Sequence, residues 1–162
     1  MELYKFGIRF QISNAAAKPL TDFIAVFHGW IQRQALAGHL LVDVHDYSHV
    51  PNGPGILLVA HEANLNIGET ERSLVYIRKQ PALLAETLAS AQAAAKLLIA
   101  EQEVQFQSGQ FEVFANDRLL APNTAAGAAQ WQALVAQATG GQVVQKSNDP
   151  RERLTFVVTQ QP

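Results

Sequence analysis

Hydrophobic and polar residues alternate along the first segment of the chain and predict a half-buried β-strand. The apolar positions are Tyr4, Phe6, Ile8, Phe10 and Ile12, and the positions between them hold Lys5, Gly7, Arg9 and Gln11. One polar face is typical of an antiparallel or mixed sheet, because strands of a parallel sheet covered on both sides are apolar on both faces. We therefore expect a sheet with one face open to solvent.

Three later segments follow the helical period instead, with apolar residues three or four positions apart. The first helix is predicted between Pro19 and Gly38, the second opens at Pro81 and runs to about Leu98, and the third lies between Thr124 and Gly140. The boundary residues suit these places, because proline is tolerated in the first turn, a threonine hydroxyl caps a helix start, and glycine adopts the left-handed conformation after a helix end.

Short apolar runs between the helices predict the remaining strands. They cover residues 40–45, 56–67, 74–79, 104–106, 111–114, 143–144 and 154–158. Residues 46–55 hold two prolines and two glycines and are expected to form a loop, and residues 68–71 form the next turn. We predict one α+β domain over residues 1–162: a mainly antiparallel sheet with about three helices packed on one face, a two-layer sandwich for which ferredoxin-like topology is a candidate arrangement.

Composition narrows the range of partners. The chain is 48% hydrophobic and 16% charged with a net charge of −2, as expected for an ordinary globular domain without a footprint for nucleic acid or an anionic membrane. It has no cysteine, which excludes disulfides, thiolate catalysis and cysteine-ligated zinc. No apolar run approaches the ~20 residues that cross a bilayer, and no secretory signal is visible, so a cytoplasmic protein is expected.

The histidines are concentrated in one region, residues 28–61, which contains all five of them. The segment between Arg33 and Arg72 has no lysine or arginine, but it contains Asp43, Asp46, Glu62, Glu69 and Glu71. Imidazoles beside carboxylates are the chemistry of an acid/base pair or of a divalent-metal site. The competing interpretation is a solvated polar sheet face.

The side-chain period of two tests whether these residues meet. If residues 48–55 form the loop of a hairpin, Tyr47 lies opposite Ile56 and His45 opposite Leu58. Asp43, His45, Tyr47 and Glu62 then share the outer face of the sheet. The same register turns Val42, Val59 and His61 toward the helices, where His61 is expected to be a buried core histidine with a hydrogen-bond partner.

The candidate catalytic residues are therefore Asp43, His45 and Glu62, and Asp46, Tyr47 and His49 are candidates for an adjoining pocket. We expect no bound metal and no cofactor, since one face offers at most Asp43, His45 and Glu62 as ligands. No G-x-S-x-G, H-E-x-x-H, G-x-G-x-x-G or zinc spacing occurs. The pair Asn123-Thr124 is interpreted as a helix cap, with a weaker claim to anion binding.

Two functional hypotheses remain open. The first is a non-catalytic module that self-associates and binds a small molecule or a protein on a sheet face. Its dimer is predicted to be two-fold and to pack Leu41, Tyr47, Ile56 and Leu58 of the outer face against a second copy. The alternative is a small hydrolase- or isomerase-type enzyme that uses His45 with Asp43 or Glu62.

Overall fold

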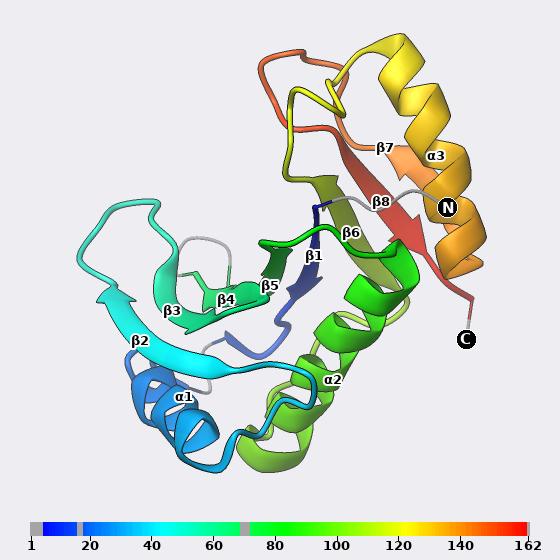
Figure 1. Cartoon of the computed structure of the whole chain (residues 1–162). Helices are drawn as coiled ribbons and strands as arrows, with labels where there is room; N and C mark the ends of the chain where they lie inside the picture. The colour runs from blue at the N-terminus through cyan, green and yellow to red at the C-terminus, as the bar shows by residue number, and fades with distance from the viewer. Residues whose placement is uncertain (1–4, 16–17, 69–71, 162) are drawn as a thin grey trace.

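The computed structural model describes residues 5–15, 18–68 and 72–161. Within them, eight strands form one antiparallel sheet in the order β2-β3-β4-β5-β1-β6-β8-β7 (Figure 1). The strands are β1 (Phe6–Gln11), β2 (Leu41–Tyr47), β3 (Gly55–Ala60), β4 (Ala63–Ile67), β5 (Ser73–Arg78), β6 (Gln110–Ala115), β7 (Gln142–Gln145) and β8 (Thr155–Thr159). The helices are α1 (Asp22–Arg33), α2 (Leu84–Gln102) and α3 (Ala125–Thr139).

Strand β1 lies in the middle of the sheet, although it comes first in the chain. It pairs antiparallel with β5 on one side and with β6 on the other, so that Ile8 lies opposite both Tyr76 and Val113. Ile8 is completely buried. The meander β2–β5 and the C-terminal strands β6, β8 and β7 therefore extend one continuous sheet in opposite directions from β1.

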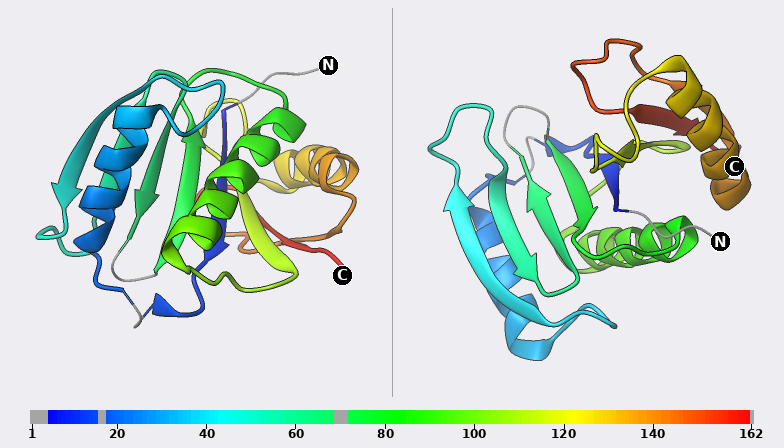
Figure 2. Two further views of the ribbon diagram at one scale, coloured as in Figure 1. Left: turned by 90° about the horizontal axis from the view of Figure 1, so that it is seen from below. Right: turned by 45° about the horizontal axis from the view of Figure 1, so that its top comes forward.

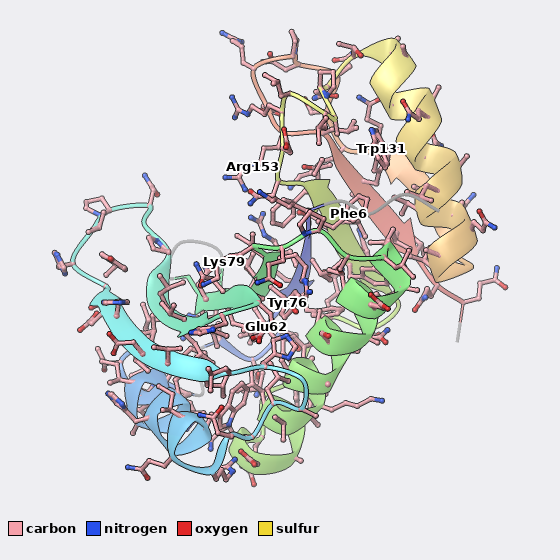
Figure 3. The ribbon with its side chains drawn as sticks, in the orientation of Figure 1. Phe6, Glu62, Tyr76, Lys79, Trp131 and Arg153 are labelled. Atoms are coloured by element: carbon pink, nitrogen blue, oxygen red, sulfur yellow. The ribbon has the colours of Figure 1, made fainter. Side chains whose placement is uncertain are left out.

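All three helices pack on the same face of the sheet. Helix α1 contacts β2 and β3, α2 contacts β1 and β5, and α3 contacts β7 and β8 (Figure 2). Phe6 of β1 meets Trp131 of α3 edge to face, with ring centroids 5.7 Å apart (Figure 3). The Trp30 indole donates a 3.1 Å hydrogen bond to Glu101, which also pairs with Arg33 and so links α1 to α2.

The predicted α+β sandwich is thus confirmed, whereas a ferredoxin-like topology is not. Four strands, β2 to β5, stand between α1 and α2 in the chain, where the ferredoxin-like pattern has two. No helix among the described residues combines the length and the apolar character that a membrane crossing requires.

The predicted register of the β2–β3 hairpin is wrong by one residue. Tyr47 lies opposite Gly55 and His45 opposite Leu57, so Ile56 and Leu58 face the helices and are fully buried. The cause is Gly55, which the sequence analysis assigned to the loop. Its φ of +73° and its close approach to the carbonyl oxygen of Ile67, 2.0 Å from where a Cβ would lie, let it start β3.

The start of β2 also differs from the prediction. The register shifts between Leu41 and Asp43, which marks a bulge at Val42. Leu41 is consequently buried on the helix side, and Val42, predicted to point inward, is 50% exposed. The outer face therefore lacks Leu41, Ile56 and Leu58, three of the four apolar residues on which the predicted dimer patch was based.

The prediction for His61 is wrong as well. Residues 56–67 are two strands, β3 and β4, and His61 lies exposed in the turn between them, where its N–H donates to the carbonyl of Leu40. Ala60 and Ala63 both face the helices and are fully buried. The apolar residues directly before and after this tight turn both face the helices. The hydrophobic pattern therefore continues across the turn and gives no sign that the chain reverses there.

Other boundaries differ by a few residues. Helix α1 ends where Gln34 takes a left-handed conformation, before Gly38, and α2 begins at Leu84 rather than at Pro81. Residues 104–106 form only an isolated bridge, between Phe106 and Ile12.

The predicted cap of α3 is confirmed, since the Thr124 hydroxyl accepts a 3.1 Å hydrogen bond from the N–H of Gly127. Tyr4 and the turn residues 69–71 lie outside the described residues.

Gly7 is a testable requirement of the sheet, because the Phe114 ring of β6 lies directly over it. A Cβ at position 7 would meet the Phe114 ring at 2.0 Å. We expect Gly7→Ala to lower the free energy of unfolding by about 1–3 kcal/mol in urea denaturation. Gly29→Ala is the control: a Cβ there has its nearest neighbour at 3.5 Å, and alanine in this helix should stabilise by about 0.5–1 kcal/mol. Equal stability of Gly7→Ala and the wild type would contradict this packing.

Candidate functional site

Asp43, His45 and Tyr47 share the uncovered face of β2, as predicted. The Nε2 atom of His45 lies 3.5 Å from Oδ2 of Asp43, and the rings of His45 and Tyr47 are 6.0 Å apart. The other carboxylate oxygen of Asp43 accepts a 2.8 Å hydrogen bond from the N–H of Val44. The side chains of His45 and Asp43 are 46% and 57% exposed, so water screens the pair.

Glu62, the third predicted catalytic residue, does not join this pair. Its carboxylate accepts a 3.0 Å hydrogen bond from the N–H of Leu40, five residues before His45 on an extended segment, or roughly 15 Å at the strand rise. Desolvation opposes the charge of Glu62, but hydrogen bonds from the N–H groups of Leu40 and Glu62 and attraction by His39 and His61 outweigh it and lower its pKa. Glu62 therefore fastens the β3–β4 turn to the start of β2.

Asp46 lies near the end of β2, opposite Ile56 and so on the other side of the strand from Asp43, and His49 lies in the turn that follows. Asp46 accepts hydrogen bonds from the hydroxyl and the N–H of Ser48, and these bonds, aided by His49, hold the pKa of Asp46 below its usual value. In the part of the chain that the structure describes, no three histidine, aspartate or glutamate side chains are arranged to hold a metal ion. The three predicted pocket residues, Asp46, Tyr47 and His49, are neighbours along the chain, at the end of β2 and in the turn after it.

A buried polar chain connects His39, Tyr76 and Arg78. His39 Nδ1 lies 2.9 Å from the carbonyl oxygen of Ala37, which only accepts, so Nδ1 carries a proton and donates it. Nε2 lies 2.6 Å from the Tyr76 hydroxyl oxygen, to which Arg78 donates at 3.3 Å. Tyr76 is fully buried. This network is internally satisfied, and it fastens the segment before β2 to β5.

A cavity of about 550 Å³ lies near the start of α1 and the end of α2. Two of its polar side chains hold the backbone. Arg72 donates to the carbonyl of Lys18 at 2.9 Å, and Asn14 bonds the carbonyl of Glu103 and the N–H of Gln105.

A group of cations surrounds Phe114 on the uncovered face of the sheet. The guanidinium carbons of Arg9 and Arg153 lie 5.9 and 5.5 Å from the centre of the Phe114 ring. The ring itself is only 4% exposed, because Gly7 gives it room on β1 and the arginines cover it. Cation–π contact holds both guanidinium groups in place. Together with Arg118 of the loop after β6, they form what we call the arginine cluster.

The charges of this cluster are incompletely balanced. Glu112 pairs with Arg9 at 3.4 Å and with Lys146 at 2.8 Å. Within the described part of the chain, neither Arg118 nor Arg153 forms an ion pair with a carboxylate. Desolvation and then repulsion by Arg118 and Arg9 lower the pKa of Arg153, although a guanidinium remains charged at neutral pH.

Asn123 fixes the two loops that carry most of these cations. Its amide nitrogen donates to the carbonyls of Ser147 at 3.0 Å and Asp149 at 2.9 Å, and its oxygen accepts from Gln145 at 2.7 Å. Asn123 is 5% exposed. The side chain thereby locks the β6–α3 loop (residues 116–124) to the β7–β8 loop (residues 146–154). Figure 3 shows Arg153 at this end of the sheet, well away from Glu62.

This site was not predicted from the sequence. Its cations come from β1 and from loops more than a hundred residues further along the chain, and no local spacing connects Arg9 with Arg118 and Arg153. The one hint in the sequence was the pair Asn123-Thr124, which was given a weak claim to anion binding. Thr124 caps the helix, and Asn123 joins the two loops that carry Arg118 and Arg153.

Comparison with protein-family models, with curated proteins and with solved structures gave no match to this chain.

The role of Asn123 can be tested by substitution. We expect Asn123→Ala to lower the free energy of unfolding by about 2–3 kcal/mol, because it removes three hydrogen bonds of a buried side chain, to the carbonyls of Ser147 and Asp149 and from the Gln145 amide. Asn148→Ala, in the same pair of loops but solvent-exposed, should change it by less than about 0.5 kcal/mol. Urea denaturation measures both values. Similar effects of the two substitutions would show that Asn123 does not lock the loops.

Proposed function

We propose that this protein is a non-catalytic binding module that holds an anionic group of its ligand at the arginine cluster on the uncovered sheet face. The observation that carries the proposal is the placement of Arg118 and Arg153. Arg153 lies close enough to both Arg9 and Arg118 to be repelled by them, and neither Arg118 nor Arg153 pairs with a carboxylate of the described chain. Like charges held together raise the free energy of the fold, and a bound anion removes that cost.

The geometry favours a carboxylate or a phosphate as the anion. A guanidinium presents a planar set of N–H donors that matches two oxygens of such a group. Arg9 and Arg153 are held over Phe114, and the Asn123 hydrogen bonds fix the loops of Arg118 and Arg153. Little conformational entropy is therefore lost when the ligand binds.

The charge balance favours one anionic group over a polyanion. Asp117, Asp149 and Glu152 lie in the same two loops as the arginines, and the whole chain carries a net charge of −2. Nucleic-acid binding relies on many phosphate contacts and would be opposed by these carboxylates. Either a small molecule or a protein side chain can supply a single carboxylate or phosphate.

The enzyme alternative gains no comparable support. The Asp43–His45 pair is exposed, and Glu62 has a different role at the β3–β4 turn. We therefore propose no reaction at these residues.

Pyrophosphate is a suitable probe for the arginine cluster. We expect it to bind in isothermal titration calorimetry at low ionic strength and to be displaced by salt. Arg153→Gln should weaken the affinity about tenfold, since one charge-assisted hydrogen bond is lost. Arg151→Gln is the matched control: Arg151 lies in the same loop, but it pairs with Asp149 at 2.8 Å. Its affinity should stay within about twofold of the wild type.

Two results would contradict the proposal. One is the absence of pyrophosphate binding to the wild type at low salt. The other is an equal loss for Arg151→Gln and Arg153→Gln, which would indicate a general charge effect without a site.

A further inference from the structure

The cavity of about 550 Å³ near the start of α1 and the end of α2 combines apolar walls with charged side chains. Ile12, Phe23 and Val104 line it and are each 5% exposed or less. Ile99 of α2 lines it as well and is 51% exposed. The volume lies within the roughly 300–1,000 Å³ of pockets that bind small molecules in proteins. A mixed lining of this kind suits a ligand that is charged at one end and apolar at the other.

Hydrogen bonds between distant segments hold the wall of this cavity in a fixed shape. The N–H of Ser13 donates to the carbonyl of Gln105 at 2.8 Å, and the Asn14 side chain accepts from the N–H of Gln105 at 2.8 Å. The N–H of Ile12 donates to the carbonyl of Arg72 at 2.9 Å. The left view of Figure 2 shows the start of α1, the end of α2 and the segment after β1 at the lower edge of the molecule. The cavity is therefore preformed, which lowers the entropy lost when a ligand binds.

Arg72 lines the cavity with a guanidinium group that is only partly hydrogen-bonded. Its Nη1 donates to the carbonyls of Lys18 at 2.9 Å and Ala15 at 3.5 Å. The Nε atom is buried, and neither Nε nor Nη2 has an acceptor among the described residues. These two nitrogens share the edge of the guanidinium that binds a carboxylate with two parallel hydrogen bonds. One nitrogen of Arg72 thus holds the side chain in place, and the other two are left for an anion.

The charges of the lining favour an anion with a single charge. Lys18 lines the cavity together with Arg72, which bonds its carbonyl. Glu103 is the carboxylate among the described lining residues, and neither cation forms an ion pair with it or with another described carboxylate. Two positive charges and one negative charge leave an excess of one positive charge. A single carboxylate balances that excess, whereas a dianion would meet stronger repulsion from Glu103.

We propose that this cavity is a second binding site, which takes a small monocarboxylic acid with an apolar body. The carboxylate binds Arg72 and Lys18, and the apolar body lies against Ile12, Phe23 and Ile99. None of the residues that line the cavity belongs to the arginine cluster. The inference therefore goes beyond the proposed function and does not depend on it.

Octanoate is the probe for this site, since it has one carboxylate and an apolar chain. We expect isothermal titration calorimetry to show one site per chain, and octan-1-ol, which lacks the charge, to bind at least about tenfold more weakly. Lys18→Gln should weaken octanoate binding about three- to tenfold, because one of the two cations is lost. Lys96→Gln is the matched control, since Lys96 is an exposed lysine of α2 outside the cavity. Its affinity should stay within about twofold of the wild type.

Further substitutions probe the two ends of the bound acid. Arg72→Lys keeps the charge but cannot form both parallel bonds, so it should bind octanoate about tenfold more weakly. Glu103→Gln removes the opposing charge and should strengthen binding about threefold, a gain that a loss of folding cannot produce. Ile99→Ser should weaken binding about threefold, because apolar contact is lost. Ala100→Ser, at the exposed neighbouring position outside the cavity, should have no effect.

The outcomes for this site are separate from those for the arginine cluster. Lys18→Gln should leave pyrophosphate binding unchanged, and Arg153→Gln should leave octanoate binding unchanged. The site is overturned if octanoate does not bind the wild type, if it binds no more tightly than octan-1-ol, or if Lys18→Gln and Lys96→Gln lose equal affinity. Octanoate binding that depends on Arg153 overturns it as well. Loss of pyrophosphate binding at the arginine cluster leaves the octanoate site in place.

Discussion

The position of β1 between β5 and β6 is the constraint on which the rest of this structure depends. The first strand of the chain must pair with a strand that ends at Arg78 and with another that begins at Gln110. This pairing joins the β2–β5 meander to the C-terminal strands and gives one layer for all three helices to cover. It also determines both faces at once: Phe6 meets Trp131 on the helix side, and Gly7 receives Phe114 on the other side.

The polar side chains on the two faces of the sheet differ in how completely they are paired. On the helix side, one buried polar network has its partners within the chain, in the hydrogen bonds from Ala37 through His39 and Tyr76 to Arg78. On the uncovered face, Glu112 serves two cations, while Arg118 and Arg153 lack a carboxylate among the described residues. Buried polar groups that are fully hydrogen-bonded stabilise a fold, so we assign a structural role to the His39–Tyr76–Arg78 network. Charges without a partner favour the binding of a ligand of opposite charge, so we propose binding at Arg118 and Arg153.

Several predictions from the sequence are confirmed because they depend on local periodicity. The alternation around Ile8 predicts β1, and the apolar residues at helical spacing after Pro19 and after Pro81 predict α1 and α2. Thr124 caps α3, as predicted. The outward direction of Asp43, His45 and Tyr47 is also as predicted. The predictions for His61 and for the β2–β3 register are wrong, because a tight turn and a glycine that starts a strand leave no change in the apolar pattern. Burial of His61 required an uninterrupted strand, and the chain reverses at that residue.

The sequence by itself determined the class of the fold, since local alternation and helical stripes dictate which segments form strands and helices. It also determined that the net charge of the chain is only −2. Only the tertiary structure decided the order of the strands and the position of the candidate site. Arg9, Arg118 and Arg153 come together because β1 pairs with β6 and because Asn123 joins two loops, and both are contacts between residues far apart in the chain. Local periodicity carries no information on such contacts, because their free energy depends on the whole sheet being formed.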